Sequence, residues 1–341
     1  MKEYGSDFHY LDNYHSKHTH LTDVYHNTIL MANGRQCIVT LIQQYQWQRI
    51  WMPEYFCHEV TQTIVMQTSI KIVYYPDWPG NDDKKIIESL PYQQGDVLFR
   101  MNYFGMRGFR SNINIPVPVI EDHSHDLLGH WALYSDAEWC IASLRKSLPI
   151  PEGGMLWSPK RYRIDIDISS SKDNEEIAQI RWEAMLMKSD YLADKINDKN
   201  EFRKKYVETE EWFIQLEPSL IDERSRNYIE NININAWNRA KRKNWKKLSQ
   251  LVKTETLFPE NIDCTPFTFI ILADDKENRD HIKTRLIEKN VYPAILWDIH
   301  EATNAKVLDF SQRILSIHCD GRYTKFDMQQ LAAIINDSIL L

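Results

Sequence analysis

The sequence contains no apolar run of the ~20 residues that a membrane-spanning helix needs, so we expect no membrane partner. It also contains no Cys-x-x-Cys pair, and an odd number of widely spaced cysteines argues against a zinc site or a disulfide framework. The start, MKEYGSDFHY, has neither a signal segment nor an arginine-rich amphipathic pattern, which predicts a cytoplasmic protein. The cysteines, expected to be buried free thiols, are Cys37, Cys57, Cys140, Cys264 and Cys319.

Glycine is scarce, with 10 residues in 341, or about 3% against a usual ~7%. A scarce glycine tends to occupy a position where the backbone needs its conformational freedom. Half of the glycines fall between residues 105 and 154: Gly105, Gly108, Gly129, Gly153 and Gly154. We therefore expect turns that shape a site in this stretch.

An excess of positive charge is absent too, since 41 Lys and Arg against 48 Asp and Glu give a formal net charge of −7. An acidic chain is a poor binder of polyanions unless one face is locally basic. The basic run NRAKRKNWKKL at 238–248 has helical spacing, and on a helix such a run is typically a solvated face. We therefore expect no nucleic-acid partner.

Short apolar runs alternate with segments of helical spacing between residues 30 and 160. Strands are predicted over 49–52, 70–75, 96–103, 117–121 and 138–142, and helices over 35–46 and 58–67. This alternation predicts an α/β fold with a doubly wound, mainly parallel sheet.

The rest of the chain predicts a second, smaller α/β unit. Residues 173–251 have the pattern of long charged helices, and the tryptophans on them, Trp182, Trp212, Trp237 and Trp245, are expected in the core or in a dimer interface. Strands at 267–272 and 314–317 then alternate with helices at 277–289 and 325–339. A length of 341 residues suits about two domains, which we place at 1–220 and, with a helical linker at its start, at 221–341.

Two reactive side chains follow neighbouring predicted strands, where open α/β sheets bind their ligands. Asp122 ends the strand in VIEDHSH, and Lys146 follows the next strand in SLRK. A partly desolvated lysine can form a Schiff base with an aldehyde, and an aspartate can pair with a protonated pyridine nitrogen. Alone, each residue is more often a solvated lysine or a helix cap, but together they predict the protein half of pyridoxal 5'-phosphate chemistry.

A phosphate site for this cofactor is predicted at Asn33, Gly34 and Arg35, where a predicted helix starts at Arg35. Free backbone N–H groups at a helix N-terminus bind phosphate readily. Ser143 offers a hydroxyl three residues before the reactive lysine, and Arg145 offers a positive charge.

These segments resemble the DegT/DnrJ/EryC1/StrS aminotransferases, pyridoxal-phosphate enzymes of the aspartate aminotransferase fold type I, over most of the chain. ANGRQCIVTL is similar to the family's phosphate turn, and WMPEYFCHEVTQTI to the strand-to-helix segment that follows it. RMNYFG and VIEDHSH resemble the segment that leads to the pyridine-binding aspartate. K-x6-GG, with Glu152 before the glycines, resembles the lysine segment, and RILSIHCDGRYTKFDMQQLAAII resembles the family's C-terminal tail.

The resemblance implies that Lys146 is the Schiff-base lysine, that Asp122 pairs with the pyridinium, and that His125 lies near the cofactor's 3-hydroxyl. The sequence departs from the family pattern at four places. The family's serine five residues before the lysine is Ile141 here, and its stacking aromatic aligns with Cys57, which leaves Phe56 or Tyr55 as substitutes. The tail has His318 in place of proline, and no counterpart of the partner-subunit asparagine is identified near 218–226.

The function implied by the resemblance is transfer of an amino group from an amino acid such as glutamate to a keto sugar, taken as nucleotide-linked, in a homodimer. Two alternatives stay open: a catalytically silent relative that acts in binding or assembly, and a pyridoxal-phosphate enzyme of another reaction type. Dehydratase-like relatives usually replace the lysine with histidine. The histidine groups that invite a metal, His18 with His20 and His123 with His125 and His130, lack a further ligand, so no metal is predicted.

Overall fold

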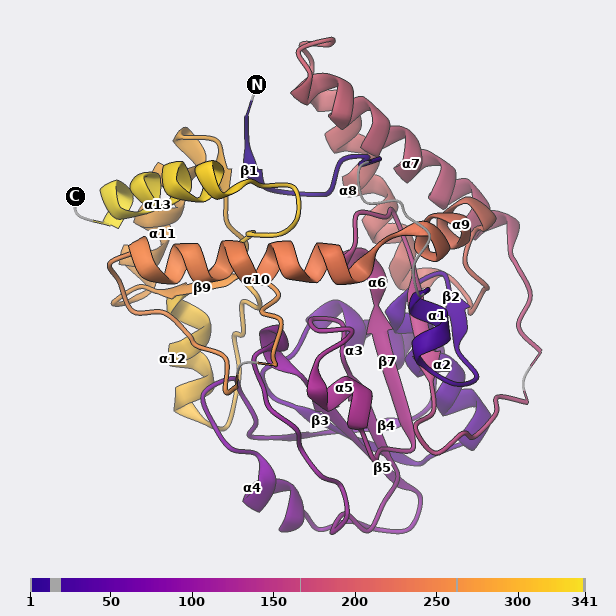
Figure 1. The fold of residues 1–341 in the computed structure, drawn as a ribbon. Coiled ribbons are helices and arrows are strands. Elements are labelled where there is room, and N and C mark those ends of the chain that lie inside the picture. The colour runs from indigo at the N-terminus through magenta and orange to yellow at the C-terminus, as the bar shows by residue number, and fades with distance from the viewer. Residues whose placement is uncertain (1, 13–19, 166, 262, 340–341) are drawn as a thin grey trace.

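A seven-stranded sheet forms the centre of the protein (Figure 1). The structure is a computed structural model that describes residues 2–12, 20–165, 167–261 and 263–339. Its strand order is β2-β8-β7-β6-β5-β3-β4. The strands are β2 (Ile29–Met31), β3 (Arg49–Pro53), β4 (Lys71–Tyr75), β5 (Asp96–Met101), β6 (Val119–Asp122), β7 (Trp139–Ser143) and β8 (Gly154–Trp157). In this sheet β8 runs opposite to the other six strands, so the predicted mainly parallel sheet is confirmed.

Both faces of the central strands are buried, and successive side chains of one strand enter different cores. Val97 and Phe99 of β5 pack into a core with α2 (Gly34–Tyr45) and α3 (His58–Gln67). Leu98 packs on the other face, in a core with α7 (Lys172–Leu192) and α9 (Glu223–Asn231). Burial on both faces explains why these strands appear in the sequence as nearly continuous apolar runs.

The region predicted as charged helices holds α7, α8 (Asn200–Gln215), α9 and α10 (Ile234–Leu251). Three of its four tryptophans are buried, whereas Trp212 is 44% exposed. The basic run lies on α10, and only part of it is the solvated face that we predicted. Lys241 is 2% exposed and its amine lies 5.5 Å from the ring centre of Phe267.

The C-terminal part contains β9 (Phe269–Leu272), which pairs antiparallel with β11 (Ile314–Ile317). Around this pair lie α11 (Lys276–Glu288), α12 (Ala305–Arg313) and α13 (Lys325–Ile339). The short strand β10 (Val291–Tyr292) pairs in parallel with β1 (Tyr4–Gly5), so the N-terminal segment lies against the C-terminal part. The division of the chain at residue 220 stays a prediction.

Short helical turns complete the chain: α1 (Leu21–Val24), α4 (Lys84–Glu88), η1 (Tyr103–Gly105), α5 (His130–Tyr134) and α6 (Leu144–Ser147). Of these, α6 follows β7 directly and carries Lys146. No helix in the described ranges combines the length and the apolar character that a membrane crossing requires.

Candidate active site

Asp122 and Lys146 come from neighbouring strands of the sheet and line the same pocket. Asp122 is the last residue of β6, which pairs with β7, and Lys146 lies in α6 directly after β7. Their pocket has a volume of about 30 Å³. Seven residues that the sequence suggested for the cofactor line it: Asn33, Gly34, Arg35, Asp122, Ser143, Arg145 and Lys146.

The Asp122 carboxylate is held by Ser124. Its Oδ1 accepts hydrogen bonds from the Ser124 backbone N–H at 2.8 Å and from the Ser124 hydroxyl. The same hydroxyl accepts a 2.7 Å hydrogen bond from the backbone N–H of Ser143 and so connects the ends of β6 and β7. Within the described ranges Oδ2 accepts no hydrogen bond, which leaves one oxygen of a nearly buried carboxylate for a ligand.

The N-terminus of α2 closes one end of this pocket. Asn33 caps the helix, with its Oδ1 accepting from the Gln36 N–H at 3.1 Å. A Cβ on Gly34 would lie 3.0 Å from the Ser143 Cβ and 3.2 Å from its Cα, so glycine permits the helix end to approach β7 this closely. The backbone N–H groups that the sequence predicted for a phosphate are thereby brought beside Ser143.

Three buried donors near this helix end have no hydrogen-bond acceptor among the described residues: Asn33 Nδ2, Arg35 Nη1 and Arg145 Nε. An unpaired buried N–H is costly, and two of these belong to guanidinium groups. A phosphate would supply the missing acceptors and the missing negative charge. The residues present therefore fit pyridoxal phosphate at its phosphate end, as well as at Lys146 and Asp122.

Lys146 is half-buried, and its amine forms no hydrogen bond or ion pair within the part of the chain that the structure describes. It lies 5.8 Å from the ring centre of Trp297, which comes from the loop after β10. An amine without a fixed protein partner at a pocket wall is available to a ligand.

His125 is buried beside the larger cavity that adjoins the lysine. Its ring stacks on Phe267 at 4.3 Å between ring centres, and its Nδ1 accepts a 3.0 Å hydrogen bond from the Phe104 N–H. Burial, with the nearby Lys146 and Lys241 charges, lowers the pKa of His125 well below its usual value. The ring is therefore neutral at pH 7, with its hydrogen on Nε2.

Phe56, which the sequence suggested as a substitute for the stacking aromatic, lines neither the small pocket nor the larger cavity. Its ring packs against Phe99 at 5.0 Å and Trp297 at 5.6 Å between ring centres, and it lines a separate cavity. Tyr55 is fully buried, and its hydroxyl donates to the Leu296 carbonyl. Cys57 is the residue of this segment that lines both the small pocket and the larger cavity, because neighbouring side chains after β3 point in different directions.

The larger cavity has a volume of about 530 Å³ and includes Lys146 in its wall. A cluster that we did not predict lies at its edge, where Glu210 of α8 meets Arg35, Arg145 and Arg181. Burial raises the pKa of Glu210, but the three guanidinium groups lower it more, to about 2. These side chains are far apart along the chain and follow no fixed spacing, so only the folded structure could reveal the cluster.

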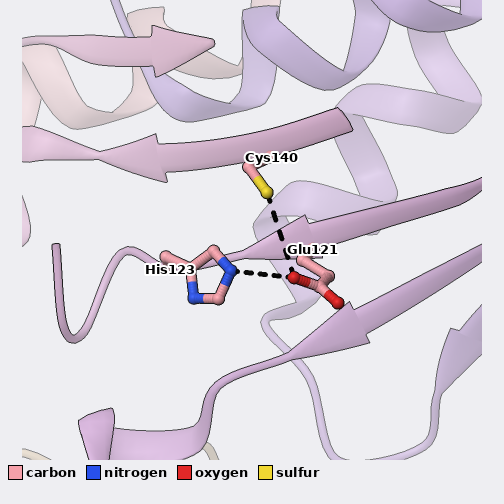
Figure 2. Close-up of side chains that lie close together, drawn as sticks. All are labelled: Glu121, His123 and Cys140. Atoms are coloured by element: carbon pink, nitrogen blue, oxygen red, sulfur yellow. Dashed lines mark hydrogen bonds and ion pairs between the residues drawn. The ribbon is translucent and has the colours of Figure 1, made fainter. Parts of the chain in front are cut away.

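Figure 2 shows another group that the sequence did not suggest, formed by Glu121, His123 and Cys140. Glu121 Oε2 lies 3.1 Å from His123 Nε2 and 3.9 Å from the Cys140 sulfur. Glu121 also accepts hydrogen bonds from Asn112 at 2.7 Å and Ser135 at 2.6 Å. This buried network satisfies the carboxylate without an ion.

Only some of the histidines that the sequence analysis considered as metal ligands belong to this group. His123 belongs to it, but His125 and His130 do not. His18 lies outside the described residues. The absence of a metal stays a prediction.

No family model matches the sequence, and no curated protein matches it. Solved structures do resemble the fold. PseC from Helicobacter pylori, an aminotransferase involved in the biosynthesis of pseudoaminic acid, superposes with a TM-score of 0.64 at 12% identity and covers 99% of both chains.

Two further aminotransferase structures superpose over most of the chain. TlmJ from Streptoalloteichus hindustanus gives a TM-score of 0.61 at 11% identity, covering 94% of this chain and 88% of its own. A DegT DnrJ EryC1 StrS aminotransferase from Brucella abortus gives 0.57 at 13% identity, covering 93% and 87%. The chain therefore has the pyridoxal-phosphate fold type I, which is the fold of these aminotransferases.

Proposed function

We propose that the protein is an aminotransferase that depends on pyridoxal 5'-phosphate. The observation that carries this proposal is that Lys146, Asp122 and the N-terminus of α2 line the same pocket, at the ends of β6 and β7. When bound, the cofactor would supply an aldehyde that accepts amino groups and a ring that withdraws electrons from the reacting carbon.

Each polar residue of the pocket then has a separate task. The Lys146 amine would hold the cofactor at its aldehyde end and would carry a proton away from the α-carbon of the amino donor. Asp122 would pair with the ring nitrogen through Oδ2 and favour its protonated form. Asn33, Gly34, Arg35 and Ser143 would bind the phosphate, and His125 would lie near the 3-oxygen as a hydrogen-bond donor.

The proposed substrates are an amino acid such as glutamate as donor and a nucleotide-linked keto sugar as acceptor. The 530 Å³ cavity beside Lys146 is of a size typical for ligand sites and supports a substrate larger than an amino acid. The similarity of the fold to PseC supports a sugar acceptor. We further propose that the protein works as a homodimer in the cytoplasm.

The donor half of the reaction tests this proposal. Protein loaded with cofactor should release 2-oxoglutarate from glutamate, up to about one equivalent per subunit, while its absorbance between roughly 400 and 430 nm falls. Asp122→Asn removes the charge that keeps the ring protonated. The rate of 2-oxoglutarate release should then fall by orders of magnitude, since several kcal/mol of transition-state stabilisation are lost.

The exposed Asp165→Asn, which makes the same chemical change away from the pocket, serves as the control and should keep the wild-type rate. If loaded wild-type protein released no keto acid from any amino acid, aminotransfer would be refuted. A silent binding protein or another reaction would then replace it.

A further inference from the structure

Four charged side chains from four helices meet at the wall of the larger cavity. Glu210 Oε1 lies 3.0 Å from Arg35 Nη2 and 2.7 Å from Arg145 Nη2, and its Oε2 lies 3.6 Å from Arg181 Nη1. The arginines come from α2, α6 and α7, and the glutamate comes from α8. We call these four residues the arginine cluster.

The arginine cluster carries three positive charges against one negative charge, and its arginines are largely buried. The side chains of Arg35, Arg145 and Arg181 are 9%, 17% and 4% exposed, whereas that of Glu210 is 40% exposed. Burial and repulsion from Arg145 both lower the pKa values of Arg35 and Arg181. A buried excess of positive charge is unfavourable unless an anion joins it.

Other carboxylates near the cavity act on these arginines only from a longer distance, Glu59 on Arg35 and Asp7 on Arg181. Asp7 and Glu59 also line the cavity, but neither forms an ion pair with a cluster arginine within the described ranges. Glu59 instead accepts a 2.9 Å hydrogen bond from the Cys57 thiol. Glu210 is thus the acid in direct contact with all three guanidinium groups.

Two donors of the arginine cluster stay unpaired in the described structure, although both atoms are buried. These are Arg35 Nη1 and Arg145 Nε. Guanidinium groups offer their N–H donors in a planar fork that matches the oxygens of a phosphate. One kind of ligand, a dianion with several oxygens, would both accept hydrogen bonds from the unpaired donors and neutralise the excess positive charge.

We propose that Arg35, Arg145 and Arg181 form a phosphate-binding site and that Glu210 is the internal counter-ion which the phosphate displaces. Arg35 and Arg145 line both the small pocket and the larger cavity, whereas Arg181 and Glu210 line only the larger cavity. The phosphate can therefore belong to the cofactor or to a substrate. Only this attribution rests on the proposed function, because the site itself does not require aminotransfer.

Calorimetric titration of the cofactor-free protein with inorganic phosphate, in buffer of low chloride content, tests the site. Arg145→Gln should weaken phosphate binding about tenfold or more, because it removes a charged donor. Among the described residues Arg145 hydrogen-bonds only to Glu210, whereas Arg181 also bonds to the Pro151 carbonyl, so Arg145 is the safer variant for folding.

Glu210→Gln gives the sharper result because it should change binding in the opposite direction. Removing the internal competitor should tighten phosphate binding several-fold, which a purely structural ion pair would not do. Glu208→Gln is the matched control, since Glu208 lies on the same helix, is 53% exposed and, among the residues that the structure describes, pairs only with Lys204. Its phosphate affinity should equal that of the wild type.

The same titration of cofactor-saturated protein identifies the source of the phosphate. If inorganic phosphate no longer binds, the site holds the cofactor's phosphate; if it still binds with the same response to both variants, the site holds a substrate's phosphate. Either result supports the site. A wild type that binds no phosphate, or a Glu210→Gln protein that binds it no more tightly, would overturn the proposal, whatever the glutamate assay shows.

Discussion

The carboxyl group of Glu152 is buried in the folded protein, which is unfavourable for its charged form. It precedes Gly153 and is fully buried, with Oε1 accepting from the Asp222 N–H at 2.7 Å and Oε2 unpaired within the described residues. Burial raises its pKa from about 4.5 to about 8, although the hydrogen bond from Asp222 opposes this shift. The native protein therefore favours the protonated form at neutral pH.

A group whose pKa is higher in the folded state than in the unfolded state stabilises the fold fully at pH values below its unfolded pKa. This stabilisation is lost as the pH rises through the folded pKa. Between pH 5 and pH 8 the wild type should thus lose a few kcal/mol of unfolding free energy relative to Glu152→Gln, which has no charge to bury. Urea unfolding of both proteins across this range measures the difference. Parallel profiles would contradict the assignment, and the exposed Glu175→Gln should run parallel to the wild type.

Single residues differed in how far the sequence could predict them. Lys146 and Asp122 could be placed in one pocket because each follows a strand directly, and strand ends meet at one edge of a parallel sheet. Arg181 and Glu210 could not, since they lie on long charged helices with no local pattern that marks them. Phe56 lines a separate cavity, because adjacent residues after a strand face different sides, and Cys57 occupies the side facing the pocket.

At the scale of elements, periodicity predicted the longer helices and the buried strands well. The bounds of α3, β11 and α13 match the predicted ranges. The strands β2 and β8 were missed. They have three and four residues, and β8 follows Gly153 at φ +117, a turn that sends the chain back antiparallel.

The basic run on α10 shows how a charged segment can mislead. Trp237, Lys241, Trp245 and Leu248 recur at helical spacing and form its buried face, so one lysine of the run points inward with the apolar residues. The amphipathic pattern was present in the sequence, but the density of charge concealed it. The pairing of β1 with β10 left no such signal, because it joins residues nearly 300 positions apart.

At the scale of the whole molecule, the account predicts a homodimer. Enzymes of this fold build their sites across a two-fold interface, and a closed two-fold dimer is the commonest arrangement of soluble oligomers. Sedimentation equilibrium of cofactor-loaded protein at micromolar concentration should give twice the chain mass of 40.6 kDa. A single species of chain mass with cofactor bound would contradict the dimer.

The central claim is that Lys146 holds pyridoxal phosphate covalently, and its most direct test is to locate the attached group. Borohydride reduction of loaded protein, followed by digestion and mass spectrometry, should place the reduced cofactor on Lys146 alone. Lys146→Ala should lose both the label and the absorbance between roughly 400 and 430 nm. A label on Lys241, the buried lysine next to Phe267, or one spread over exposed lysines, would contradict the account.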